Sequence, residues 1–252
     1  MIAYITGASS GFGKAIALRL AKNGYNIVVT GRRKPLLDEL SQEIRDKHKV
    51  EVLVSNYDVR CAEAVKNAVD NLPEKWKRID VLVNNAGLAV GLNSIQNGDI
   101  DDWERMIDTN IKGLLYVSRH IAPLMIKQGY GHIINIGSIA GKEVYPNGNV
   151  YCATKHAVDA LTKAMRMDMI KDGIKVTQIA PGAAETEFSL VRFKGDKQAS
   201  DNVYKGFAPM TADDIANVVE YVVYLPHHLC LNDIVMTPLA QASVTIINKT
   251  EK

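Results

Sequence analysis

The segment ITGASSGFGKAIA, residues 5–17, decides the fold, because it joins a short apolar run to a helical pattern through a glycine-containing turn. The apolar run, residues 2–6, has the composition of a buried strand, and the helical pattern ends at Gly24. A glycine turn lets the backbone approach a pyrophosphate, and the first N–H groups of the helix favour an anion. The glycine spacing differs from GxGxxG, so a tight structural turn stays an alternative. The glycines are Gly7, Gly11 and Gly13.

Outward from this turn, β-rich runs alternate with helical patterns. The further expected strands lie at 26–31, 50–59, 79–87, 132–138, 174–182 and 233–239. The expected helices lie at about 11–24, 34–47, 61–72, 102–128, 149–172 and 211–225. Continuous Val and Ile runs in this alternation are typical of a parallel sheet that is covered on both faces. We therefore predict one α/β domain over residues 1–252, a doubly wound Rossmann-type fold with about seven parallel strands and helices on both faces.

One stretch, about 185–210, interrupts the alternation. It is polar and contains glycines, and no regular pattern runs through it. A long irregular insertion in a compact domain is often a lid or a binding loop. We expect it to be the substrate loop.

Composition narrows the class of protein. The formal net charge is +2, and this near-neutral balance argues against nucleic acid or an anionic membrane as the main partner. Three scattered cysteines (Cys61, Cys152 and Cys230) fit neither a disulfide framework nor a metal site. No apolar run reaches about 18 residues and no signal peptide is visible. We expect a cytoplasmic protein that binds no metal.

The residues at the end of the second expected strand distinguish NAD binding from NADP binding. An acidic residue here would bind the ribose 2′-hydroxyl of NAD, but the sequence is VVTGRRKP, residues 28–35. Arg32 and Arg33 could instead clamp a 2′-phosphate with their guanidinium groups. This pair favours NADP over NAD. The alternative is that one or both arginines are only solvated at the start of a helix.

A tyrosine and a lysine stand four residues apart in NVYCATKHAV, residues 149–158. In a helix, this spacing places Tyr151 and Lys155 on the same face. The two side chains could simply be exposed to solvent, with no role in catalysis. They could also be an acid–base pair in which the ammonium favours the phenolate.

Several motifs in register settle the question by resemblance. They are TGxxxGxG at Thr6–Gly13, NNAG at 84–87, Asn110, Ser138 and YxxxK at Tyr151–Lys155. Their order and spacing resemble the classical short-chain dehydrogenase/reductase family over essentially the whole chain. The resemblance implies an enzyme of Rossmann type that transfers a hydride between a nicotinamide cofactor and a CH–OH group.

The resemblance also implies roles for four catalytic residues. Tyr151 would be the general acid/base, helped by Lys155, and Ser138 would hold the substrate oxygen. Because the reference pKa of tyrosine is about 10, the phenol needs such help at neutral pH. Asn110 would anchor a water molecule for proton relay.

Further family contacts to the cofactor are carried over position by position. The acidic and apolar pair beside adenine would be Asp58 and Val59, and Asn84 would lie near the adenine ribose. The PGxxxT segment would border the nicotinamide. The full set is Gly7, Ser9, Ser10, Gly11, Phe12, Gly13, Arg32, Arg33, Asp58, Val59, Asn84, Ala86, Gly87, Tyr151, Lys155, Pro181, Gly182 and Thr186.

Other stretches, among them SLVRFKGD at 189–196, resemble a narrower group, the NADP-dependent 3-hydroxy acid dehydrogenases that act on L-serine or L-allo-threonine. A 3-hydroxy acid needs a cation for its carboxylate. Arg192 is the first candidate and Lys194 the second, because a guanidinium can bind a carboxylate through two hydrogen bonds. A solvated loop arginine stays an alternative. Glu187 could meet a substrate ammonium or simply begin a helix.

Three readings therefore stay open. The first is a dehydrogenase of small 3-hydroxy acids such as L-serine, L-allo-threonine and 3-hydroxypropanoate, with malonic semialdehyde as an oxo substrate. The second is a 3-oxoacyl-thioester or general carbonyl reductase, and the third is an inactive NADPH-binding sensor. The resemblance implies a homotetramer that pairs the 102–128 and 149–172 helices.

Overall fold

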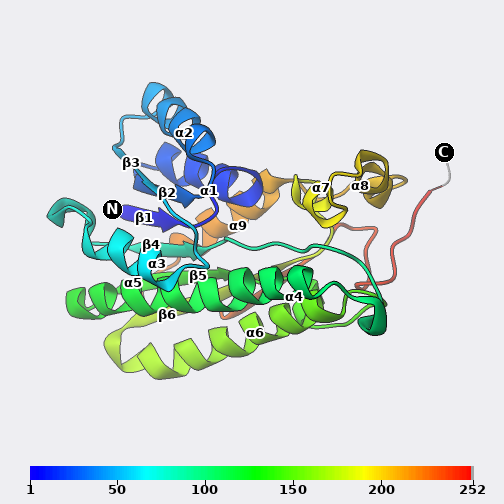
Figure 1. Cartoon of the computed structure of the whole chain (residues 1–252). Coiled ribbons are helices and arrows are strands. Elements are labelled where there is room, and N and C mark those ends of the chain that lie inside the picture. The colour runs from blue at the N-terminus through cyan, green and yellow to red at the C-terminus, as the bar shows by residue number, and fades with distance from the viewer. Residues whose placement is uncertain (251–252) are drawn as a thin grey trace.

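The computed structural model describes residues 1–250, and these contain one parallel sheet of seven strands in the order β3-β2-β1-β4-β5-β6-β7. In Figure 1 the N-terminal strand lies at the left of the molecule and the C-terminal segment at the right. The strands are β1 Ile2–Ile5, β2 Asn26–Gly31, β3 Val52–Asn56, β4 Val81–Asn84, β5 Gly131–Ile136, β6 Ile174–Pro181 and β7 Asp233–Met236. All seven predicted strands are present, and the prediction of a doubly wound parallel sheet is confirmed.

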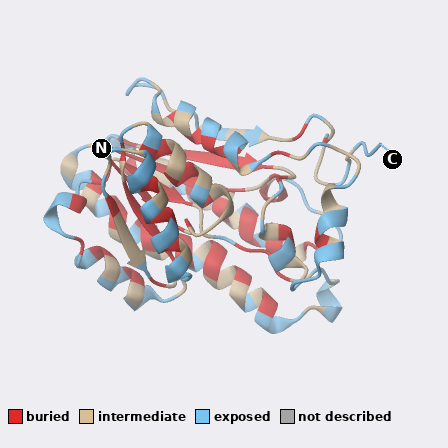
Figure 2. Ribbon diagram, turned by 90° about the horizontal axis from the view of Figure 1, so that it is seen from above, coloured by how far each residue is buried: buried red, intermediate tan, exposed pale blue. Residues whose placement is uncertain are grey.

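The central strands are buried on both faces, which is why their sequences are continuous rather than alternating apolar runs. Every residue of β1, β4 and β5 is buried. Figure 2 shows these buried strands in the middle of the molecule, with exposed positions on the outer sides of the helices. β7 at the edge alternates between exposed and partly buried residues.

Helices cover the two faces of the sheet in two groups (Figure 1). The apolar residues of α1, α2 and α9 pack in one core, and those of α3, α5 and α6 pack in the other. The α-helices are α1 Gly11–Lys22, α2 Lys34–Lys47, α3 Ala62–Asp70, α4 Ile100–Ile107, α5 Leu114–Gln128, α6 Asn149–Met169, α7 Phe188–Arg192, α8 Lys197–Tyr204 and α9 Ala212–Val223. The short helical turns are η1 Glu74–Trp76, η2 Ile95–Asn97, η3 Asp108–Gly113, η4 Ile139–Gly141 and η5 Ile170–Asp172.

The predicted helix at 102–128 is interrupted. α4 begins two residues earlier, where the Asp99 side chain accepts a hydrogen bond from the backbone of Asp101. The segment η3 between α4 and α5 is a π-helix. Apolar periodicity does not distinguish a π-helical turn from an α-helical one, so this feature was not visible in the sequence.

The predicted irregular insertion at 185–210 contains α7 and α8, which lie together in Figure 1. The Asp196 side chain caps α8 by accepting a hydrogen bond from the backbone of Ala199. α7 has only five residues, and α8 has eight that are mostly polar, so neither shows a clear apolar period.

No helix among the described residues is both long and apolar enough to cross a membrane.

Candidate active site

The carboxyl ends of β1 and β4 are joined by side-chain hydrogen bonds. The hydroxyl of Thr6 accepts hydrogen bonds from the backbone N–H groups of Asn85 and Ala86, each at 3.0 Å. The Asn85 amide donates to the carbonyls of Thr6 and Gly7, at 2.9 and 3.1 Å. These bonds hold the glycine turn against the NNAG segment, at the sheet edge where doubly wound folds bind ligands.

The glycines of the turn are required by its geometry. Gly7 and Gly11 have φ angles of +65° and +51°, a region that residues with a Cβ rarely occupy. A Cβ on Gly13 would lie 2.4 Å from the Gly7 carbonyl oxygen and 2.5 Å from the Asn85 amide nitrogen. The helix α1 begins at Gly11, so its free N–H groups face this compact turn. The turn therefore fits the pyrophosphate of a dinucleotide.

Two hydroxyls of the turn meet the arginine at the end of β2. Arg33 donates hydrogen bonds to Ser9 at 3.1 Å and to Ser10 at 2.6 Å. The same guanidinium pairs with Glu187 at 3.0 Å, so residues far apart in sequence converge here. A guanidinium beside two hydroxyls fits the 2′-phosphate of a dinucleotide. Arg32 is exposed.

The predicted adenine contacts have partners of their own. Asp58 forms an ion pair with Arg60 at 2.7 Å. Burial raises the pKa of Asp58, but hydrogen bonds from Arg60 and the charges of Arg60 and Arg32 hold it below its ordinary value. Val59 is buried, and its methyl groups lie against Gly113.

Asn84 is directed into the protein interior. Its amide donates to Ser118 at 3.0 Å and to Asn135 at 2.9 Å. The Asn84 side chain therefore links β4 to β5 and α5. Phe12, at the start of α1, packs against the core that α1, α2 and α9 share.

Asn110, Gly87 and Lys155 lie close together. A Cβ on Gly87 would be 3.3 Å from the Asn110 side-chain oxygen and 3.6 Å from the Lys155 ammonium nitrogen. The Asn110 side chain accepts a hydrogen bond from the backbone of Leu88 and donates to the Leu88 carbonyl and to Thr154. The π-helical segment η3 thus fixes Asn110 beside Lys155.

Tyr151 and Lys155 are both buried on the first turns of α6, as the spacing predicts. The ammonium donates a hydrogen bond to the Ile136 carbonyl at 2.9 Å and lies 6.0 Å from the centre of the Tyr151 ring. Burial lowers the pKa of Lys155 to about 8. Burial also raises the pKa of Tyr151 above its ordinary value, and Arg192 and Ser138 oppose that shift.

Ser138 follows β5 and caps the short turn η4. Its oxygen accepts a hydrogen bond from the backbone of Ala140 at 3.1 Å, and its hydroxyl donates to the Pro181 carbonyl at 3.4 Å. The same hydroxyl lowers the pKa of Tyr151.

The PGxxxT segment continues from β6 towards α7. A Cβ on Gly182 would lie 2.2 Å from the Gln241 side-chain oxygen. Thr186 approaches the glycine turn, because a Cβ on Gly11 would lie 3.5 Å from its Cβ. The structure therefore brings the start of the substrate loop against the start of α1.

Arg192 lies over the rings of the site. Its guanidinium carbon is 5.2 Å from the ring centres of both Tyr151 and Tyr145, and 6.0 Å from that of Phe188. The guanidinium donates to the Tyr145 hydroxyl. Its Nε atom is buried and has no hydrogen-bond partner among residues 1–250. This donor can therefore serve an anion.

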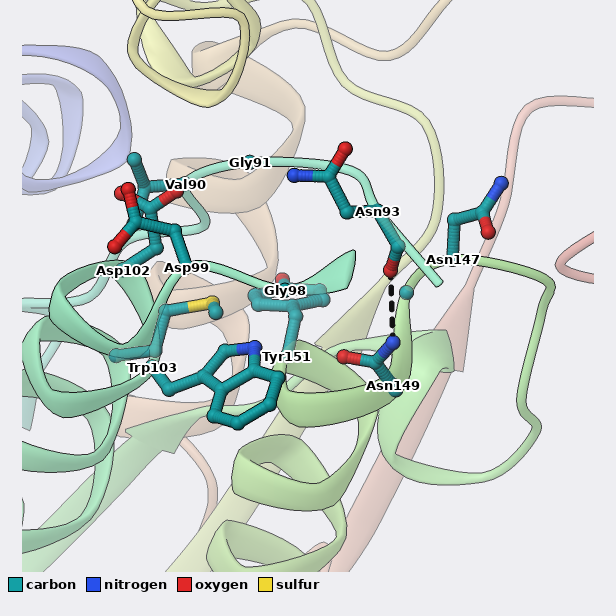
Figure 3. Close-up of a pocket in the computed structure, with 12 residues that line it drawn as sticks. Val90, Gly91, Asn93, Gly98, Asp99, Asp102, Trp103, Asn147, Asn149 and Tyr151 are labelled. Carbon is teal, nitrogen blue, oxygen red and sulfur yellow. Dashed lines mark hydrogen bonds between the residues drawn. The ribbon is translucent and has the colours of Figure 1, made fainter. Parts of the chain in front are cut away.

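Lys194, the second predicted cation, is paired within the chain. Its ammonium lies 2.7 Å from Asp102 and 3.4 Å from Asp99. Both carboxylates line a small pocket beside Tyr151, which Figure 3 shows together with the side-chain amides of three asparagines. The asparagines are Asn93, Asn147 and Asn149.

Sequence reasoning missed two contributors to the site and the partner of a third. Asn85 fixes the glycine turn, but it was not separated from its neighbours in NNAG. Tyr145 binds Arg192 from a loop, where no periodicity marks it. Glu187 was considered for a substrate ammonium, and the structure pairs it with Arg33.

Comparisons with known proteins agree with this geometry. A family described as short chain dehydrogenase matches residues 1–196. Sulfoacetaldehyde reductase 2 of Chromohalobacter salexigens is 45% identical over 96% of this chain and 95% of its own. An NADP-dependent 3-hydroxy acid dehydrogenase of Salmonella typhi is 44% identical over 96% of both chains.

A solved structure extends the similarity to the fold. The closed form of serine dehydrogenase complexed with NADP⁺ is 40% identical, covers 100% of both chains and superimposes with a TM-score of 0.93. With the glycine turn, the YxxxK pair and the serine after β5 in register, this chain belongs to the short-chain dehydrogenase family.

Proposed function

We propose that this oxidoreductase uses NADP to oxidise the 3-hydroxyl of small 3-hydroxy acids and to reduce the corresponding 3-oxo acids. L-serine, L-allo-threonine and 3-hydroxypropanoate represent the alcohols, and malonic semialdehyde represents the oxo substrates. The similarity to an NADP-dependent 3-hydroxy acid dehydrogenase supports the cofactor and the substrate class.

The cofactor assignment rests on the residues that fit a phosphorylated dinucleotide. The glycine turn would hold the pyrophosphate, and Arg33 with Ser9 and Ser10 would hold the 2′-phosphate. Arg32 would add a second positive charge. When bound, the nicotinamide accepts or donates the hydride.

Tyr151 would exchange the proton of the substrate oxygen. In the oxidation direction its phenolate takes the proton of the 3-hydroxyl, and in reduction its phenol returns it. Ser138 would orient the substrate oxygen with its hydroxyl, which follows β5 and faces the Pro181 carbonyl. Lys155 would add positive charge next to the phenolate, and Asn110 would keep the Leu88 backbone and the neighbouring Gly87 in place.

The observation that carries the substrate class is the position of Arg192. Its guanidinium lies over the Tyr151 ring and has a buried Nε without a partner among the described residues. A buried donor without a partner is costly, and a bound carboxylate would satisfy it. Lys194 is the weaker candidate, because Asp102 and Asp99 already neutralise its charge.

A sulfonate is the second candidate for the anion. The 45% identical relative is a sulfoacetaldehyde reductase, and a guanidinium binds a sulfonate through the same hydrogen bonds. A 3-oxoacyl thioester is less well supported, since three asparagines and two aspartates line the small pocket beside Tyr151 together with Val90, Trp103 and Met106. The intact Ser138, Tyr151 and Lys155 set argues against an inactive NADPH-binding sensor.

The test is reduction of NADP⁺ at 340 nm with L-serine, L-allo-threonine, 3-hydroxypropanoate and 2-hydroxyethanesulfonate. The wild type and Arg192→Ala are compared, with NAD⁺ and a neutral alcohol as controls. We expect turnover with NADP⁺ on at least one anionic alcohol and a KM at least about 10-fold higher in the variant. Turnover only on neutral alcohols or acyl thioesters would refute the proposed substrate class.

A homotetramer belongs to the same proposal, and light scattering of the purified protein tests it.

A further inference from the structure

We propose that Asp102 and Lys194 are positioning residues that fasten the substrate loop to α4 and thereby hold the Arg192 guanidinium over Tyr151. The inference rests on the proposed function, in which Arg192 binds the anionic group of the substrate. It gives Lys194 a role different from that of a second substrate cation.

The ion pair joins a buried carboxylate to a lysine at the surface. The Lys194 ammonium nitrogen lies 2.7 Å from Asp102 Oδ2, and the two side chains are 52% and 4% exposed. Asp102 stands in the first turn of α4, where the helix dipole favours a negative charge. Its other cationic neighbour, Arg105, is 3.7 Å from Oδ1. Lys194 is therefore the closest cation to a largely buried carboxylate, and its removal would leave that charge without its nearest partner, which is costly at a site that water barely reaches.

The backbone on both sides of Arg192 is fixed by the same group of residues. Lys194 has a φ angle of +53°, which is uncommon for a residue other than glycine and marks a specific turn at the end of α7. The Arg192 carbonyl accepts a hydrogen bond from the Gly91 backbone at 3.0 Å. Gly91 in turn touches Asp102, because a Cβ on Gly91 would lie 2.6 Å from Asp102 Oδ2. Asp102 thus contacts both the cation and the backbone that hold Arg192.

Figure 3 shows the Asp99 and Asp102 side chains near each other at one end of the pocket beside Tyr151. Asp99 is exposed, lies 3.4 Å from Lys194, and caps α4. The two carboxylates therefore differ in burial and in distance while they face the same lysine. Asp101, also in the first turn of α4, is 77% exposed and lies 3.8 Å from Arg105, so Asp101→Asn is a matched control that leaves the ion pair and the pocket untouched.

Loss of the ion pair should act on the binding of anionic substrates. Lys194→Met and Asp102→Asn should each raise KM for the 3-hydroxy acid about 10-fold with kcat changed less than about 3-fold. The conservative Lys194→Arg should keep KM near the wild-type value, and Asp101→Asn should also stay close to the wild type. KM for a neutral alcohol should change in none of them.

Hydrogen exchange of the substrate loop supplies a readout that does not depend on turnover. The backbone amides of Gly91, Lys194 and Gly195 should exchange at least several-fold faster in Lys194→Met than in Asp101→Asn. Lys194 is at the surface, so this variant keeps the test open if Asp102→Asn does not fold.

The outcomes separate this inference from the proposed function. If the wild type turns over no anionic alcohol, the proposed function fails, and if Arg192→Ala leaves KM for the acid unchanged, the anion-binding role of Arg192 fails and the positioning role with it. If Arg192→Ala raises that KM but Lys194→Met changes neither KM nor amide exchange, the positioning role alone is refuted.

Discussion

The guanidinium carbon of Arg192 lies 5.2 Å from the centre of the Tyr151 ring, so the cation of the substrate loop and the proposed acid/base share one side of the site. A cation at this distance interacts with the face of the ring and lowers the pKa of the phenol. A substrate whose anion contacts Arg192 would therefore present its hydroxyl close to Tyr151. This relationship connects the specificity of the site to its acid–base chemistry.

Tyr151→Phe removes the proposed proton carrier and keeps the ring. We expect kcat to fall about 10²- to 10⁴-fold, the usual contribution of general acid–base catalysis. Binding of NADPH, followed by its fluorescence, should change much less than kcat, because the glycine turn and Arg33 would hold most of the dinucleotide. A variant that keeps more than a tenth of the wild-type kcat would show that another group carries the proton.

The rates of oxidation and of reduction should depend on pH in opposite ways. Burial raises the pKa of Tyr151, so the phenol holds its proton at neutral pH, which suits reduction. Oxidation needs the phenolate, and its kcat/KM should rise up to about tenfold per pH unit from pH 6 towards the apparent pKa of the Tyr151–Lys155 pair. Reduction should stay level there and fall at higher pH. Initial rates in both directions between pH 6 and 10 measure this, and a flat oxidation profile would contradict it.

The parts of the site that could be predicted from sequence are those carried by local geometry. The glycine turn is one short stretch that joins β1 to α1, and the Tyr151–Lys155 pair lies within α6, so their local geometry follows from neighbouring residues in the sequence. Arg192 was placed by resemblance, and its contact with Tyr151 depends on how α7 folds back over α6.

The parts that could not be predicted depend on contacts between distant segments. Tyr145 reaches Arg192 from a loop, and Glu187 reaches Arg33 across 154 positions of sequence. The π-helical turn that carries Asn110 needs an extra residue per turn, which an apolar stripe does not reveal.

Arg33→Ala should weaken recognition of a 2′-phosphate. Hydrogen bonds to charged groups contribute roughly 1.5–3 kcal/mol, so affinity for adenosine 2′,5′-bisphosphate should fall about 10- to 100-fold. Affinity for 5′-AMP should hardly change. Lys34→Ala is the matched control, since Lys34 pairs with Asp38 on the exposed face of α2. Calorimetric titration of the three proteins measures the difference, and equal losses for both nucleotides would refute a phosphate-specific role.

Gly13→Ala should damage the turn itself. The added methyl group would lie 2.4 Å from the Gly7 carbonyl oxygen and would displace the Asn85 amide. Overpacking of this kind costs about 1–3 kcal/mol of unfolding free energy, and NADPH affinity should fall with it. Gly31→Ala is the control, because its Cβ would meet Ser9 only at 3.7 Å. Urea unfolding that gives the same midpoint for both variants would contradict the steric argument.

His132 should make the protein sensitive to acid. The ring is buried in β5, its Nε2 lies 2.8 Å from the Thr177 hydroxyl, and its Nδ1 has no partner among residues 1–250. Burial lowers its pKa to about 3 from 6.5, with a smaller effect from the charge of Lys175. The folded protein therefore stays unprotonated at this ring over a range where the unfolded chain takes up a proton.

The sign of the effect follows from proton linkage. Above pH 6.5 the ring is neutral in both states and adds no pH dependence. As the pH falls from 6.5 towards 3, the unfolded state binds more protons, so this group lowers the unfolding free energy by up to about 1.4 kcal/mol per pH unit. His132→Gln should make the pH dependence of the unfolding free energy shallower by that amount. His228→Gln is the matched control, because His228 lies in an exposed turn. Urea unfolding of the three proteins between pH 4.5 and 8 measures the slopes, and an unchanged slope in His132→Gln would show that other groups cause the loss of stability in acid.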